Sequence, residues 1–259
     1  MTLSHIVLLL VAGLGAGTVN AVAGGGSLIT FPALLAVGLP PKPANFTNSV
    51  AVCPGYLASV YGSRTDLRDL AGRGGRRPLL ALFPTTVAGT LLGAILLRLT
   101  PAGAFEVIVP FLVIGAAGVL AFQVRLRALV GHPSTMSRTR RAVVLHCLVG
   151  VGSAYGGYFG AALGVMLVAG LGLVLDESMA RVNALKNAVS AVVGLVTVVA
   201  FVLFGQIDWA AVGVLAPATL LGGYVGARLA RRLPSPVLRA IIVTFGFVVG
   251  VYLLIRALR

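Results

Sequence analysis

The stretch PTTVAGTLLGAILLRLTP, residues 84–101, returns later in the chain as PATLLGGYVGARLARRLP, residues 217–234. The shared positions include Pro84, Gly89, Gly93, Ala94, Arg98 and Pro101, which match Pro217, Gly222, Gly226, Ala227, Arg231 and Pro234 at one constant offset. Upstream, Asn48, Val50 and Gly55 recur as Asn187, Val189 and Gly194 at a slightly larger offset. A duplicated apolar chain is typical of a secondary transporter or channel built from two repeats, with its site where the halves meet.

Composition places this chain in a membrane. Of its 259 residues, 58% are hydrophobic and only 10% are charged, and the mean hydropathy is +1.03. A soluble domain has about 25% charged residues, so we expect the lipid bilayer to cover this one. The formal net charge of +14 comes from short basic runs between apolar segments, a pattern typical of cytoplasmic loops rather than of a basic face for nucleic acid. We therefore expect no nucleic-acid partner.

The side chains that carry enzymatic chemistry are scarce. Cys53 and Cys147 lie within apolar stretches, and the three histidines have no spacing that would hold a metal. The acidic residues lie at segment ends or in loops, apart from Glu106 just inside a segment. Without paired carboxylates or a nucleophile beside a base, we expect no enzyme, no metal site and no cofactor.

The apolar segments predict an all-α polytopic protein. Six of them approach the roughly 20 residues of a membrane-spanning helix: residues 45–61, 79–97, 104–122, 184–204, 209–227 and 237–255. Two are longer, Leu3–Leu39 and Ala142–Leu175, and each contains closely spaced glycines. We interpret each long segment as a pair of short helices separated by a break, so that a glycine-broken helix pair opens each repeat.

Arginine distribution predicts the orientation of the halves. Gly62–Pro78 and residues 125–141 are rich in arginine and should be cytoplasmic, whereas Thr100–Gly103 has no basic residue. In the second half the bias is reversed, because Gly205–Asp208 has no basic residue and arginines flank the later turn. We therefore expect two inverted repeats, residues 1–124 and 142–259, joined by a basic cytoplasmic linker loop at residues 125–141. An eight-span parallel arrangement stays open, because the inverted one places the basic C-terminal tail outside.

The glycine tract Gly24, Gly25 and Gly26, followed by Ser27, is the first candidate binding element. Each glycine costs about 1 kcal/mol in a helix relative to alanine, so three in a row should open the helix at membrane depth. Freed backbone N–H groups and the Ser27 hydroxyl would form an anion-binding nest. The alternative is close helix packing without a ligand.

Polar residues at two helix starts form the second candidate element. Thr47 and Asn48 begin the segment that follows the tract, and Asn183, Lys186 and Asn187 begin its counterpart. Amide side chains can replace the water shell of a substrate. A lysine inside an apolar segment usually faces a cavity, where it would supply the counter-charge of an anion. The alternative is that Lys186 reaches the membrane interface and pairs with Asp176 or Glu177.

These motifs resemble those of a known family. The first helix ends in Ala-Gly-Gly-Gly-Ser at residues 23–27, Phe31-Pro32-Ala33-Leu34-Leu35 follows, and a polar start comes next. This order, repeated in weaker form, resembles the TauE/SafE (sulfite exporter) family across essentially the whole chain. The second half departs from the pattern, with GAALGVML at residues 160–167 in place of a second glycine tract and proline. The resemblance implies a multi-pass protein of the bacterial inner membrane that moves sulfite or small organosulfur or carboxylate anions.

The expected function is thus secondary transport of a small anion by alternating access, with a coupling ion, proton or sodium, left open. The expected substrate site is Gly24, Gly25, Gly26, Ser27, Thr47, Asn48, Asn183, Lys186 and Asn187. A channel for a small solute and a membrane scaffold or sensor without transport remain alternatives. The sequence does not decide the anion, the direction of transport or the oligomeric state.

Overall fold

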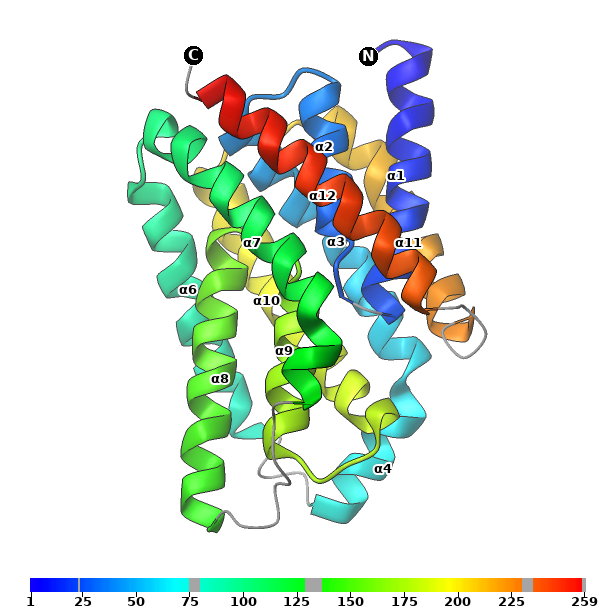
Figure 1. The fold of residues 1–259 in the computed structure, drawn as a ribbon, viewed down its shortest axis with the longest axis vertical. Coiled ribbons are helices and arrows are strands. Elements are labelled where there is room, and N and C mark those ends of the chain that lie inside the picture. Colours follow the sequence, from blue (N-terminus) through cyan, green and yellow to red (C-terminus); the bar gives the residue numbers. More distant parts are fainter. Residues whose placement is uncertain (23, 75–79, 129–136, 230–234, 258–259) are drawn as a thin grey trace.

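The regular elements of the computed structural model are helices (Figure 1). The structure describes residues 1–22, 24–74, 80–128, 137–229 and 235–257, and none of these lies in a strand. The first half contains α1 (Leu3–Val22), α2 (Ser27–Ala36), α3 (Pro41–Gly62), α4 (Arg64–Gly74), α6 (Leu82–Leu99) and α7 (Ala102–Ala128). The second half contains α8 (Arg138–Tyr158), α9 (Leu163–Val174), α10 (Met179–Phe204), α11 (Trp209–Leu229) and α12 (Ser235–Ala257). The predicted all-α fold is confirmed.

Both predicted helix breaks are present. The first lies between α1 and α2 and the second between α8 and α9. Gly24 at the first break and Gly160 at the second have φ of 86° and 73°, in the left-handed region that a side chain disfavours. The glycines at 152, 156, 160 and 164 therefore do not share one helical face, because α8 ends before Gly160.

The two halves are interleaved in space. The main partner of α1 is α11 from the other half, and the main partner of α8 is α6. The repeated glycines make these contacts close. A Cβ added to Gly222 would lie 2.2 Å from the Leu14 carbonyl oxygen of α1, and one added to Gly93 would lie 1.9 Å from the Ala154 carbonyl oxygen of α8. Glycine at these positions lets the backbones touch.

Within the described residues, five helices are long and apolar enough to cross a membrane: α1, α6, α7, α10 and α11. A membrane span was also expected at residues 45–61, but the helix there is not apolar enough to be counted as one. The helix is present as α3, but Asn45, Thr47, Asn48 and Ser49 make its first half polar. Asn45, Thr47 and Asn48 are buried against other helices rather than in contact with lipid, and Ser49 is partly buried.

Helix α4 was not expected from the sequence, which was interpreted as a loop over Gly62–Pro78. Its apolar positions are few, but Leu70 is buried in a cluster with residues of α10, including Leu185 and Val189. No helix separates α10 from α11, so α4 has no counterpart in the second half. Part of the predicted loop, residues 75–79, lies outside the described residues.

The helices also extend into the predicted linker. α7 continues to Ala128 and α8 begins at Arg138, within the residues 125–141 assigned to a loop. Arginines near the end of α7 do not stop the helix, because cations are favourable at a helix C-terminus. Residues 129–136 lie outside the described part of the chain, and the division into two repeats stays a prediction.

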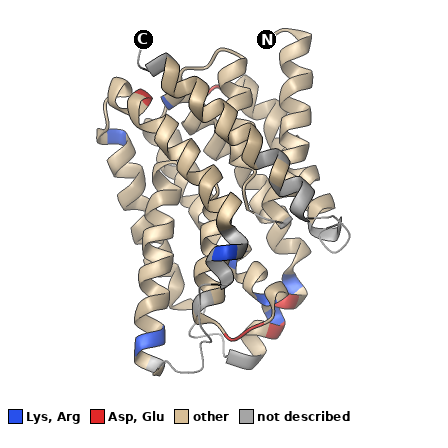
Figure 2. Ribbon diagram, viewed as in Figure 1, with Lys and Arg blue, Asp and Glu red and all other residues tan. Residues whose placement is uncertain are grey.

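Helix directions and charges distinguish the two ends of the molecule. α1 descends from the end where the chain starts, whereas α8 rises from the opposite end (Figure 1). The end that holds α4 and the start of α8 carries most of the described charged residues, while the other end carries few (Figure 2). This basic end matches the two segments predicted to be cytoplasmic, Gly62–Pro78 and residues 125–141, as far as the structure describes them.

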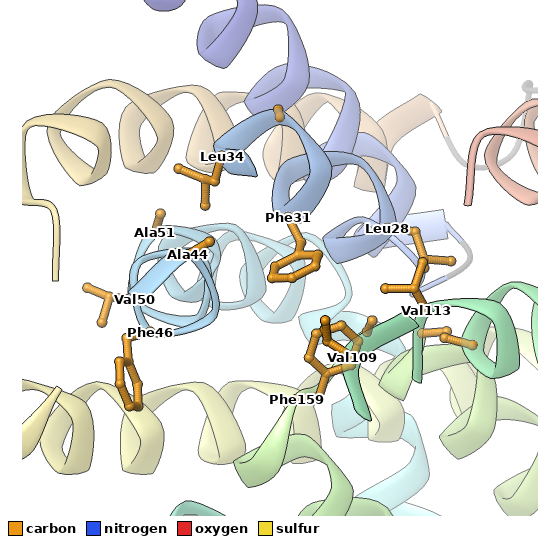
Figure 3. Close-up of a cluster of buried hydrophobic side chains, with 14 of the residues drawn as sticks. Leu28, Phe31, Leu34, Ala44, Phe46, Val50, Ala51, Val109, Val113 and Phe159 are labelled. Carbon is orange, nitrogen blue, oxygen red and sulfur yellow. The ribbon is translucent and has the colours of Figure 1, made fainter. Parts of the chain in front are cut away.

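Aromatic side chains fill the centre beside the breaks. Phe31 of α2 and Phe159 of the second break meet edge to face, with ring centroids 5.2 Å apart and an interplanar angle of 85°. In Figure 3 Val109 lies beside this pair, and Leu28 and Val113 lie to its right. The buried cluster therefore draws on both halves and fixes the second helices of both broken pairs.

Candidate functional site

The two helix breaks touch each other at the centre of the fold. A Cβ on Gly24 would lie 2.4 Å from the Gly164 Cα, and a Cβ on Gly164 would lie 2.5 Å from the Gly24 Cα. Real Cβ atoms do not approach that closely, so the contact needs glycine on both sides. Gly24 belongs to the first break and Gly164 to the first turn of α9. The backbones of the two halves therefore touch at Gly24 and Gly164, at the junction where the sequence predicts the site.

Asn20, which the sequence analysis did not single out, organises the first break. Its Oδ1 accepts a hydrogen bond of 2.7 Å from the N–H of Gly26, and the N–H of Gly24 donates to the Val19 carbonyl at 2.9 Å. Two of the three tract amides are therefore occupied, unlike in the open nest that was expected. The N–H groups of Gly25 and Ser27 have no acceptor among the described residues.

Lys186 is buried at the same place. Its side chain is 1% exposed, and its Nζ donates a hydrogen bond of 2.8 Å to the Asn20 carbonyl. The Asn183 amide donates to the neighbouring Ala21 carbonyl at 3.1 Å. Both groups satisfy C-terminal carbonyls of α1, which lack partners within that helix.

This burial argues against the interface alternative for Lys186, although the lysine is not among the residues that line the cavity described below. The lysine does not reach the membrane interface, and Glu177 is instead 2.9 Å from the Arg181 guanidinium. That ion pair is the only one among the described residues. The Lys186 ammonium thus has no carboxylate partner in the described part of the chain. It can donate three hydrogen bonds, and the structure records one.

The second break has a matching contact. Asn45 of α3 donates a hydrogen bond of 2.9 Å to the Tyr158 carbonyl at the end of α8. Asn45 and Asn183 hold corresponding places near the starts of α3 and α10. Each of these helices therefore caps the broken helix of the other half. The Oδ1 atoms of both asparagines are buried without a partner, as is the Nδ2 of Asn20.

A small cavity lies between the breaks and helices α3 and α10. Its volume is about 20 Å³, close to the space that one water molecule needs. Hydroxyl groups line it from three helices: Ser27 of α2, Ser49 and Tyr56 of α3, and Thr197 of α10. Ser27 and Leu163, which also lines the cavity, are the first residues of α2 and α9. Two helix N-termini therefore converge on this cavity, and both place positive partial charge there.

The structure gathers most of the predicted site residues, though not all. Gly24, Gly25, Gly26, Ser27, Asn183 and Lys186 lie at the crossing of the breaks, as the contacts above show. Asn48 accepts a hydrogen bond from Thr30 of α2. The other two lie in different contacts: Thr47 accepts from the N–H of Asp208 at 3.0 Å, and Asn187 donates to the Ser63 hydroxyl at 3.1 Å.

Sequence reasoning missed Asn20, Ser49, Tyr56 and Thr197. Asn20 had a usable signal, because it is an amide inside an apolar run shortly before the glycine tract. Ser49, Tyr56 and Thr197 carried none, since single hydroxyls are common in membrane helices and only the packing of α3 on α10 brings them together.

The class is that of a membrane transporter: broken helices meet at mid-fold, with a cavity that contains hydroxyl groups between them and a buried lysine beside them. Comparison with known proteins agrees. The family described as "Sulfite exporter TauE/SafE" matches residues 9–253, and the chain belongs to that family.

Several bacterial relatives are similar along nearly their whole length. The "Probable membrane transporter protein ORF9" of Sinorhizobium sp is 27% identical over 251 residues, which covers 96% of this chain and 92% of that protein. The "Probable membrane transporter protein YfcA" of Escherichia coli K12 is 29% identical over 243 residues, 92% and 86% of the two chains. A "Probable membrane transporter protein" of Haemophilus influenzae is 26% identical, covering 93% and 91%. No solved structure matches the chain significantly.

Proposed function

We propose that this protein is a secondary transporter that moves a small anion of the sulfite, organosulfonate or short-carboxylate class across the bacterial inner membrane. The observation that carries the proposal is the convergence of the α2 and α9 N-termini on one hydroxyl-lined cavity. Half-helix N-termini pointing at a mid-membrane site attract anionic groups in transporters with broken helices. The bacterial origin of the relatives supports the location.

The binding groups follow from the geometry. The N–H groups of Gly25 and Ser27 and the hydroxyls of Ser27 and Tyr56 would hold the anionic oxygens. The Thr197 hydroxyl instead donates to the Gly194 carbonyl at 2.8 Å. Lys186 lies beside the crossing, with its Cδ 3.0 Å from a Cβ built on Gly164. It would balance the negative charge of the anion from there, because opposite charges attract strongly away from water.

The size of the cavity supports alternating access. A space of about 20 Å³ is too small for a hydrated anion, so loading requires α2 and α9 to move relative to α3 and α10. The bonds from Asn45 to α8 and from Asn183 to α1 would hold the two broken pairs in this closed arrangement. The opposite directions of α1 and α8 (Figure 1) support inverted repeats, which give such a carrier equivalent inward and outward openings.

Counterflow in proteoliposomes tests the proposal. Liposomes preloaded with unlabelled sulfite, sulfate, thiosulfate, taurine, sulfoacetate or acetate would be diluted into a trace of the labelled compound. A carrier gives saturable, transient accumulation of at least one anion. Flux without counterflow would instead indicate a channel, and no flux of any compound would indicate a scaffold or sensor.

The cavity itself is tested by Tyr56→Phe. A hydrogen bond to a charged group contributes about 1.5–3 kcal/mol, so apparent affinity for the transported anion should fall about 10-fold to 150-fold. Ser190→Ala is the matched control, because Ser190 is buried on α10 but does not line the cavity, and its hydroxyl has no partner. Equal affinities of Tyr56→Phe and the control would place the anion elsewhere.

A further inference from the structure

The described interior contains one basic or acidic side chain. Among the described residues, Lys186 is the only Lys, Arg, His, Asp or Glu that is buried. Burying an unpaired charge in a membrane protein is costly, because the charge loses its hydration without gaining a partner. The position therefore favours a neutral amine when the site is empty and an ammonium when an anion occupies the site.

The surroundings of Lys186 reinforce this dependence. α1 contacts it through Asn20, and α9 contacts it through Gly164; α9 has no ionisable side chain. The other helices packed on α10 also carry ionisable groups. None of these described side chains forms a hydrogen bond or an ion pair with Lys186: Lys42, Cys53, Tyr56 and Tyr61 on α3, Arg140, Arg141, His146, Cys147, Tyr155 and Tyr158 on α8, Arg98 on α6, and Arg64, Asp66, Arg68 and Asp69 on α4. On α10 itself, Arg181 is paired with Glu177. No carboxylate lies within ion-pair distance of Lys186 among the described residues.

We propose that Lys186 carries the coupling ion, and that this ion is a proton that crosses the membrane together with the anion. This proposal rests on the proposed transport function, and each cycle moves one anion and one proton. The Lys186 amine takes a proton from water on one side, the anion binds beside the resulting ammonium, and the site turns to the other side. There the anion leaves, the ammonium releases its proton to water, and the neutral amine returns.

Thermodynamic linkage makes the two ligands cooperative. If the proton strengthens anion binding by some factor, the anion strengthens proton binding by the same factor. A monovalent anion and one proton together carry no net charge. The site can therefore turn from one side of the membrane to the other, both loaded and empty, without an unpaired charge in the low-dielectric interior. The carbonyl of Asn20 accepts a hydrogen bond from either form of Lys186, so the contact at α1 is kept throughout.

The test is accumulation driven by a pH gradient in sodium-free proteoliposomes. The probe is whichever labelled anion shows counterflow with the wild-type protein. One pH unit corresponds to 1.36 kcal/mol, so one-to-one coupling predicts about tenfold accumulation on the alkaline side. Lys186→Gln should keep counterflow with weaker affinity but lose accumulation. Lys42→Gln, which changes the only other lysine, should accumulate the anion like the wild type.

A second variant covers the case in which Lys186→Gln does not fold. Lys186→Arg keeps the positive charge but does not release a proton, so it should show counterflow without accumulation. Accumulation by either Lys186 variant overturns the assignment. Wild-type counterflow that responds to a sodium gradient but not to a pH gradient overturns proton coupling and leaves anion transport intact. The absence of counterflow for every anion removes both proposals.

Discussion

Gly24 and Gly164 show how single residues determine where the two halves meet. The two positions lie far apart in the sequence, yet neither has room for one carbon atom beyond the backbone. The neighbouring Gly25 is different, since a Cβ there would make only ordinary contacts with side chains, the nearest of which is Leu120 at 3.4 Å. The three glycines of the tract therefore have different roles, which cannot be told apart from the sequence alone.

The first residue-scale prediction follows from this difference. Gly24→Ala should abolish counterflow and lower the melting temperature, because it strains a backbone with φ of 86° by about 1–3 kcal/mol and separates the breaks. Gly25→Ala, the matched control, should melt and transport within about twofold of the wild type. Thermal unfolding in detergent and counterflow rates measure both effects. Normal transport by Gly24→Ala would show that the crossing is not needed.

At this scale the sequence predicted the glycine tract and the lysine but not their partners. Glycine runs and a lone lysine are rare in apolar segments, so they stood out. The hydrogen bond from Gly26 to Asn20 and the contact of Lys186 with Asn20 depend on how α1, α2 and α10 pack. That packing brings together residues that are distant in sequence, and no local pattern records it.

At the scale of helices, the duplicated stretch has a structural meaning. Residues 84–99 of the first copy lie on α6 and residues 217–229 of the second lie on α11. Each copy uses glycines to pack on the first helix of the opposite half. Glycines spaced four residues apart let two helices approach closely, and the contacts at these positions show that approach. The sequence did not predict α4, because that helix has too few apolar residues to show a clear period, and its burial depends on α10.

Gly222→Ala tests the element-scale contact. The added Cβ would lie 2.2 Å from the Leu14 carbonyl oxygen, so α1 and α11 must separate, and the yield of monodisperse protein should fall several-fold. Gly115→Ala on α7 is the control, since nothing lies within 4 Å of its added Cβ. The control should be neutral or stabilise the helix by up to about 1 kcal/mol. Equal yields and melting temperatures for the two variants would contradict the contact.

For the whole molecule, interleaving follows from these contacts. α1 packs on α11 and α8 packs on α6, so neither half buries its own apolar surface alone. Hydropathy and arginine counts could predict two related halves and their spans. They could not predict that helices of one half pack on helices of the other, because such patterns describe one helix at a time and not its partners.

Orientation in the membrane is the prediction at this scale. The end that holds α4 and the start of α8 is the basic one (Figure 2), and basic segments are retained in the cytoplasm. In a background without Cys53 and Cys147, single cysteines at Thr65 and Ser137 should resist an impermeant thiol reagent in intact cells. Cysteines at Gly103 and Gln206, exposed at the opposite end, should react. Permeabilised cells, in which all four should react, give the control.

Labelling of Thr65→Cys together with protection of Gly103→Cys would invert the orientation. A difference between Gly103→Cys and Gln206→Cys would contradict the fold, since both connections lie at the same end.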